Sequence, residues 1–140
     1  MRKIMSALAA VAFVQCPSPG AHAGEGKPAS PDATVKELMT RAVAGASGKE
    51  VRMLAVEYIP GGASIAHRHN AQVFVYVLEG AVKMQIAGGP LLTLGPGETF
   101  YEGTEDIHTV SANASITKPA RILVFMIKDA AAPVSLPAVQ

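Results

Sequence analysis

The sequence has neither a surplus of charge of one sign nor a long apolar segment. It carries 12 Lys and Arg residues against 11 Asp and Glu residues, and no basic patch or stripe. Nucleic acid is therefore not expected as a partner. The apolar run at residues 4–14 is too short to span a bilayer, and no later run is long enough.

Cysteine is almost absent, because Cys16 is the only one. It lies within residues 1–23, which have the features of a secretory signal peptide. Arg2 and Lys3 supply a positive start, the apolar run follows, and a small-x-small cleavage site ends at Ala23. Cleavage there removes Cys16, so the mature chain owes no stability to disulfides despite an oxidising compartment. We expect a periplasmic or secreted protein that makes no membrane contact after cleavage.

Two other interpretations of the N-terminal segment are less consistent with its residues. A buried helix would be broken at once by Pro17, Pro19 and Gly20. A lipid anchor on Cys16 would require a small residue just before it, and Gln15 is not small. Cleavage after Ala23 is the interpretation we retain.

Removing 23 of the 140 residues leaves 117, which suits one domain with a single core. Residues 24–33 are rich in Gly, Pro and Ser and are expected to form a flexible leader, followed by a domain at 34–130. The Ala- and Pro-rich residues 131–140 are expected to form a loosely held tail. Within 34–43 the apolar residues have a helical period, so a helix is slightly favoured there over a strand.

The rest of the chain predicts an all-β fold. Short apolar segments are interrupted by Gly and Pro at nearly regular intervals, which is typical of a β-sandwich or barrel. In residues 73–78 both faces of the predicted strand are apolar, as expected of a strand that is covered on both sides. The predicted strands are residues 50–59, 73–78, 81–86, 91–94, 98–102, 107–111 and 121–128.

His67 and His69 stand one residue apart at the start of this region. In an extended strand, side chains at i and i+2 point to the same face, so the two imidazoles can converge on one metal ion. A chance pair on a sheet face is the alternative. The chain has four histidines, and His22 leaves with the predicted signal peptide, so His108 is the only other one that remains.

Gly61, five residues, His67-Arg68-His69 and then Gly80 resemble the first sequence motif of the cupin superfamily. Residues 97–113, with His108, resemble the second motif more loosely. The resemblance covers about residues 50–128. It implies a single jelly-roll barrel, also called a double-stranded β-helix, in which His67, His69 and His108 share one metal ion.

The metal-binding glutamate of the first cupin motif has no counterpart here. Its position falls on Val73 or Phe74, and neither side chain can bind a metal. Gln72 offers an amide oxygen, and Glu102 is the only carboxylate that the sequence places near His108. A glutamate at a strand end is more commonly solvated, so burial statistics favour a surface position for Glu102.

The resemblance implies one divalent transition metal: Zn, Fe, Mn, Cu or Ni. Export in the unfolded state favours zinc or copper, which bind more tightly than iron or manganese. The expected function is dioxygenase-type chemistry on a small organic molecule, because three histidines resemble the all-histidine iron sites of some cupin dioxygenases. The alternative is a non-catalytic cupin that binds a small ligand or a metal, and a homodimer is left open.

Overall fold

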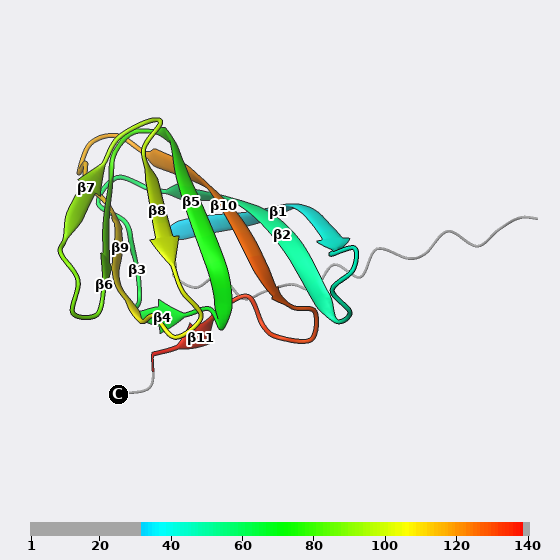
Figure 1. Ribbon diagram of the computed structural model, residues 1–140. Coiled ribbons are helices and arrows are strands. Elements are labelled where there is room, and N and C mark those ends of the chain that lie inside the picture. Colours follow the sequence, from blue (N-terminus) through cyan, green and yellow to red (C-terminus); the bar gives the residue numbers. More distant parts are fainter. Residues whose placement is uncertain (1–31, 139–140) are drawn as a thin grey trace, which may run out of the picture.

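The protein is described here by a computed structural model that places residues 32–138 (Figure 1). The predicted signal peptide and residues 24–31 of the predicted leader lie outside the described residues, whereas Ala33 already begins the first strand. Residues 32–138 form eleven strands and no helix, so none of their segments is a helix capable of crossing a membrane. The all-β prediction is confirmed.

Two antiparallel sheets face each other. The first has the order β1-β2-β10-β5-β8, and the second has the order β11-β4-β9-β6-β7, with β3 paired to β9. The first sheet comprises β1 (Ala33–Ala42), β2 (Lys49–Tyr58), β5 (Ala71–Glu79), β8 (Thr99–Glu102) and β10 (Ala120–Asp129). The second comprises β3 (Ala63–Ser64), β4 (His67–Arg68), β6 (Val82–Ile86), β7 (Leu92–Leu94), β9 (His108–Asn113) and β11 (Leu136–Pro137).

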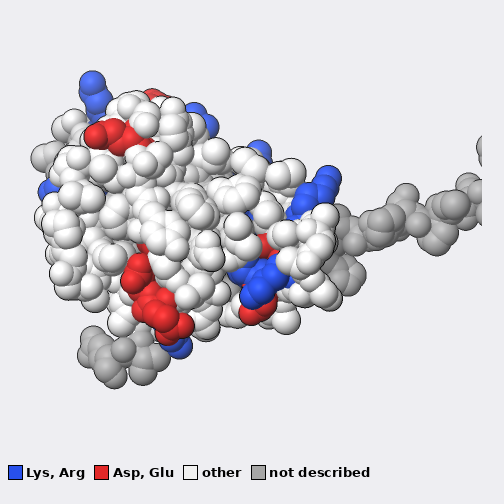
Figure 2. Space-filling model, in the orientation of Figure 1, with Lys and Arg blue, Asp and Glu red and all other residues white. Residues whose placement is uncertain are grey.

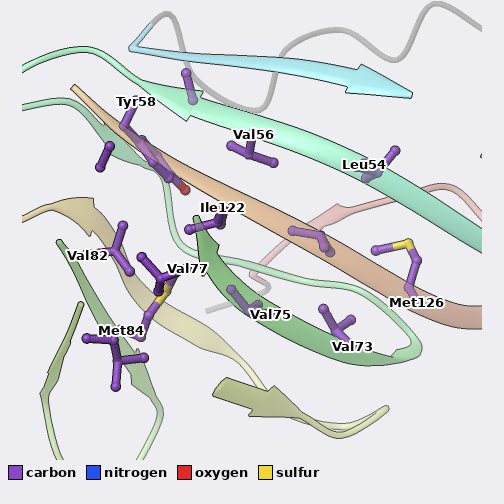
Figure 3. Close-up of a cluster of buried hydrophobic side chains, with 14 of the residues drawn as sticks. Leu54, Val56, Tyr58, Val73, Val75, Val77, Val82, Met84, Ile122 and Met126 are labelled. Carbon is purple, nitrogen blue, oxygen red and sulfur yellow. The ribbon is translucent and has the colours of Figure 1, made fainter. Parts of the chain in front are cut away.

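The core lies between the two sheets and is built from alternate residues of each strand (Figure 3). In β5, Val73, Val75 and Val77 point inward and are at most 3% exposed. Met84 of β6 and Ile122 of β10 meet them from the facing and neighbouring strands. Period-2 burial of β-branched residues is what an antiparallel sheet with one core face requires.

The choice between a helix and a strand at residues 34–43, left open by the sequence, falls to the strand, because this segment is β1, and the slight preference for a helix is wrong. This strand pairs with β2 from Ala33 to Ala42, and the register shifts between Glu37 and Met39. The extra residue, Leu38, breaks the period-2 alternation and produces apolar spacings that imitate a helix. β1 is paired with β2 in a hairpin joined by residues 43–48, and this partner strand, not the pattern within residues 34–43, determines its conformation.

The C-terminal segment also differs from expectation. Instead of hanging loosely, its described part, residues 131–138, returns to the second sheet, where β11 pairs with β4. Leu136 lies opposite Arg68, and Pro137 lies opposite His67. The Val134 side chain packs against the core. The segment therefore reaches the strand that carries the first predicted metal ligand.

Candidate metal centre

The three histidines come together at one end of the space between the sheets. His67 on β4 lies directly opposite His108 at the start of β9, so register alone brings these two residues together. His69 follows β4, and Asn70 then turns the chain into β5 with a positive φ of 47°. One nitrogen from each imidazole lies within 4.8 Å of the others. The predicted convergence of the three side chains is therefore seen in the structure.

Two backbone carbonyls orient the first two imidazoles. The Nδ1 atom of His67 donates a hydrogen bond to the Ile65 carbonyl at 2.7 Å, and the Nδ1 atom of His69 donates one to the Val134 carbonyl at 2.6 Å. A carbonyl can only accept, so Nδ1 carries the proton in both rings. In the neutral ring Nε2 is then left with a free lone pair. Such bonds fix the tautomer that metal-binding histidines use.

The two Nε2 atoms of His67 and His69 lie only 3.1 Å apart. Two bare lone pairs at this distance repel each other unless a cation lies between or beside them. Two nitrogens bound at a right angle to one metal, with bonds of about 2.1 Å, would be about 3.0 Å apart. The observed separation therefore fits a pair of neighbouring ligands on one ion.

His67 is also in the right protonation state for this role. Burial lowers the pKa of His67 below its ordinary value, and the nearby His69 and His108 rings lower it further, together outweighing the bond to Ile65 and the Glu102 carboxylate, which raise it. The imidazole is therefore neutral at pH 7, and its Nε2 lone pair is available without the release of a proton.

Glu102 is part of the same cluster. Its side chain is buried, with Oε1 at 3.2 Å from His108 Nδ1 and Oε2 at 3.8 Å from His69 Nε2. Burial raises the pKa of Glu102, but His108, His69 and His67 together lower it by more, so it lies below its ordinary value. Glu102 is thus ionised at neutral pH. The interpretation of a solvated strand end is wrong, because residue 102 faces inward in β8.

The register of the sheet explains how Glu102 can stand in for the missing glutamate. Of the two residues on which the motif's carboxylate position falls, Val73 is buried and Phe74 is exposed, and Val73 of β5 lies directly opposite Glu102 of β8. Side chains of such a pair start about 5 Å apart on the same face of the sheet. The carboxylate therefore enters the same region from the neighbouring strand.

Gln72 is not part of the site, and its proposed role as a ligand is wrong. It is exposed on β5, and its neighbour Val73 is buried and lines the cavity. Because successive side chains of a strand point to opposite faces, Gln72 faces away from the imidazoles. Although Gln72 is next to the position of the lost glutamate in the sequence, it lies on the opposite face of the strand.

Three buried polar atoms at this site make no hydrogen bond of good geometry: His108 Nε2, Glu102 Oε2 and His108 Nδ1, which nevertheless lies 3.2 Å from Glu102 Oε1. Buried polar groups are nearly always satisfied, so three in one place indicate a missing partner. A divalent cation would satisfy the lone pairs and offset the carboxylate charge. The donor set of imidazoles plus one carboxylate suits a first-row transition metal.

The site opens into a cavity of about 70 Å³ between the sheets. Its walls are mainly Val, Leu, Ile and Met side chains, and its polar groups include the hydroxyls of Tyr58, Ser64 and Ser111. The Tyr58 hydroxyl is 2.7 Å from the Ser111 hydroxyl and 3.0 Å from that of Ser64. Burial raises the pKa of Tyr58, so it keeps its proton. The sequence pattern does not predict this cluster, although Tyr58 lies at an inward position of the predicted strand at residues 50–59.

The C-terminal segment contributes to the site through its backbone as well as its side chains. Val134 and Ser135 line the cavity, and the Val134 carbonyl holds His69. Neither residue could be predicted from the sequence, because a backbone carbonyl leaves no signature in the side-chain pattern. The segment is therefore a wall of the candidate metal centre.

A chain that ends at Ala130 should bind metal more weakly than the intact chain. It loses the carbonyl that orients His69 and the strand that pairs with His67. Loss of such an orienting partner typically weakens metal affinity by about 10–100-fold. Zinc titration with a competing chelator measures the effect, with removal of residues 139–140 alone as the matched control. Equal affinity in the two truncated chains would show that residues 131–138 do not support the site.

The family assignment agrees with this geometry. A family model described as the cupin domain matches residues 54–126, which is more than half of the chain. The chain therefore belongs to the cupin family. No match was found among curated proteins.

Solved structures show the same fold in proteins with different activities. A lyase, DddQ from Ruegeria pomeroyi, is 19% identical with a TM-score of 0.61, over 76% of this chain and 52% of its own. The polyketide cyclase RemF from Streptomyces resistomycificus is 20% identical with a TM-score of 0.60, over 81% and 75%. A recombinant oxalate oxidase in complex with glycolate is 26% identical with a TM-score of 0.56, over 72% and 54%. This chain thus spans about half the length of the lyase and the oxidase.

Proposed function

We propose that this chain is an exported cupin that binds one divalent transition metal through His67, His69 and His108, with Glu102 beside them. We further propose that it performs dioxygenase-type chemistry on a small organic molecule. The observation that carries the proposal is the convergence of free imidazole lone pairs and one ionised carboxylate on a single buried point. Clusters of this kind with perturbed pKa values in a cavity are typical of functional sites.

Different residues of the chain set the charge of the site, the access of water and the supply of a proton. The carboxylate of Glu102 offsets one positive charge at the site, which leaves a net charge that favours an anionic ligand. The apolar walls limit the entry of bulk water, and the Tyr58 hydroxyl offers a proton donor within the cavity. A bound metal would supply Lewis-acid and redox chemistry, and a dioxygenase reaction needs only O₂ as co-reactant because both oxygen atoms enter the product.

The size of the cavity limits the ligand. Its volume is about 70 Å³, whereas a cavity that admits benzene measures about 150 Å³. A ligand of a few non-hydrogen atoms fits this space. A small carboxylate meets both the size and the charge, and the oxalate oxidase that resembles this chain was solved with glycolate. Glycolate and oxalate are therefore the first probes to use.

The alternative function is a non-catalytic cupin that binds a small ligand or a metal. One observation favours it: among the described residues, Glu102 is the only carboxylate that lines the cavity. If Glu102 is held by imidazoles and metal, it has little capacity to act as a general base. Isomerase and hydrolase reactions are disfavoured for the same reason.

Protein purified from its native compartment distinguishes these functions. Elemental analysis should find one divalent metal per chain, and intact mass should place the N-terminus at Gly24 without a lipid. The metal-loaded protein should consume O₂ when glycolate is added, followed with an oxygen electrode, and both atoms of ¹⁸O₂ should enter the products. Uptake of O₂ with oxalate that returns H₂O₂ would indicate oxidase chemistry instead. Zinc as the native metal would contradict the dioxygenase proposal, because zinc has no redox chemistry. A diacylglyceryl mass on Cys16 would make the protein a lipoprotein.

A further inference from the structure

Three hydroxyl groups lie together in the cavity, at a level of the barrel beyond the histidines. Ser64 of β3 lies directly opposite Ser111 of β9. His67 of β4 lies opposite His108 of the same strand, so the serine pair and the histidine pair are three residues apart along it. Tyr58 points from β2 into the space between the sheets (Figure 3), and its hydroxyl contacts both serine hydroxyls. We call Tyr58, Ser64 and Ser111 the hydroxyl cluster.

A β-bulge allows the hydroxyl cluster and the imidazoles to face the same cavity. Residues three apart in a regular strand point to opposite faces of the sheet. Thr109 is an extra residue in β9, where the register with β6 shifts between Gln85 and Ile86. His108 and Ser111, on either side of the bulge, are therefore both buried and both line the cavity. Bulges beside functional sites commonly redirect a side chain in this way.

The hydrogen bonds of the hydroxyl cluster run in one direction. The Ser111 hydroxyl donates to the Met84 sulfur at 3.6 Å. Each hydroxyl has one hydrogen, so Ser111 must accept from Tyr58, and Tyr58 must in turn accept from Ser64. The Ser64 oxygen keeps its lone pairs, and within residues 32–138 no donor points to it. It is therefore the open, accepting end of the cluster.

A ligand group that donates to Ser64 must be uncharged. Among the described residues that line the cavity, only Glu102 and the three histidines can carry charge at neutral pH, and they lie at the metal centre. In Figure 2, uncharged residues also extend across the middle of the outer surface over β5 and β8. An ammonium group beside Ser64 would lose its hydration without gaining a counter-ion. A hydroxyl group can donate there without that cost.

We propose that the cavity selects a short carboxylate with a hydroxyl group at its other end, and that Ser64 accepts a hydrogen bond from this hydroxyl. The inference rests on the proposed metal centre, which would hold the carboxylate. The two pairs of residues are about 10 Å apart along the strand. Bonds of about 2.1 Å to the metal and about 2.8 Å to the serine leave about 5 Å between the two ends of the ligand, which a three-carbon chain spans. 3-Hydroxypropanoate meets these conditions, whereas glycolate is one carbon too short to reach Ser64.

Calorimetric titration of the zinc-loaded protein with three acids tests the proposal. The wild-type protein should bind 3-hydroxypropanoate about 10-fold more tightly than propanoate, which lacks the hydroxyl, and 3-fluoropropanoate, which has the same size but no donor. Ser64→Ala should abolish this preference and leave the affinity for the other two acids within about twofold. Ser64→Thr keeps a hydroxyl and should keep the preference. The matched control is Ser47→Ala, which makes the same change on an exposed serine between β1 and β2.

Two outcomes would overturn this proposal and leave the metal centre in place. The first is equal binding of the three acids by the zinc-loaded wild-type protein, which decides the matter even if a variant does not fold. The second is a preference for 3-hydroxypropanoate that Ser64→Ala leaves unchanged, because both ends of the ligand would then bind the metal. A wild-type protein that holds no zinc would instead overturn the proposed function together with this inference. Circular dichroism and zinc content show whether each variant is folded and loaded.

Discussion

Replacing His67, His69 or His108 with alanine is expected to lower metal affinity by at least about 100-fold in each single variant. The three ligand nitrogens lie within 4.8 Å of one another, so each variant removes one donor from the same ion. Loss of a partner that only orients a ligand costs about 10–100-fold, and loss of the ligand itself should reach the upper end or exceed it. Competition titration with zinc and a chromogenic chelator measures the affinity.

The control for these variants is Thr109→Ala. Thr109 follows His108 on β9 but is exposed, and its hydroxyl bonds only to the Gln85 carbonyl at 3.1 Å. Its removal changes the same strand without removing a donor, so metal affinity should stay within about twofold. Wild-type affinity in all three histidine variants would exclude a shared site. Reduced affinity in Thr109→Ala as well would point to disturbance of β9 rather than loss of a ligand.

The histidines could be found from the sequence because their positions follow from local spacing. His67 and His69 share a face through the two-residue period of a strand. The pairing with His108 needs only the known order of the cupin motifs. The all-β fold follows in the same way from short apolar segments and frequent turns, and it was predicted without any knowledge of strand order.

The features that the sequence did not reveal depend on the pairing of strands or on the backbone. Leu38 forms a bulge in β1, so the spacing of the apolar residues in this strand resembles that of a helix. The carbonyl that orients His69 belongs to Val134 in the C-terminal segment. Because every residue has a carbonyl, the sequence gives no sign of this contact. Glu102 could be placed near His108 along the chain, but its burial follows from its register opposite Val73. Gln72 was misjudged because proximity along a strand says nothing about the face.

Glu102→Gln is expected to weaken metal binding by about 10–100-fold, whereas Gln72→Ala should change it by less than about twofold. The first substitution keeps the shape of the side chain and removes its charge. A dipositive ion among neutral imidazoles needs a nearby anion, and unit charges at ~4 Å attract by about 4 kcal/mol at an intermediate dielectric. Glu102 lies that close to His69 and His108, and Gln72 faces away from the cavity. The same zinc competition assay compares the two variants.

A second substitution in the Glu102→Gln protein separates loss of charge from local damage. Val73→Glu places a carboxylate directly opposite residue 102, at the inward-facing one of the two positions on which the glutamate of the first cupin motif can fall. If the site needs one inward-facing carboxylate at this level of the barrel, the double variant should recover at least about tenfold in affinity over Glu102→Gln. In the otherwise wild-type protein the same Val73→Glu change adds a second buried anion, which repels Glu102 and should lower stability.

The pattern across these variants is what tests the role of Glu102. Recovery in the double variant, with no effect of Gln72→Ala, would mean that one buried negative charge matters and that either of two facing strands can supply it. Equal affinity of Glu102→Gln and wild type would show that the imidazoles hold the ion alone. The lowered pKa of Glu102 would then reflect its surroundings without any part in binding. A double variant that is folded but stays as weak as Glu102→Gln would show that the carboxylate must come from β8, because only from that strand does it lie 3.2 Å from His108 Nδ1.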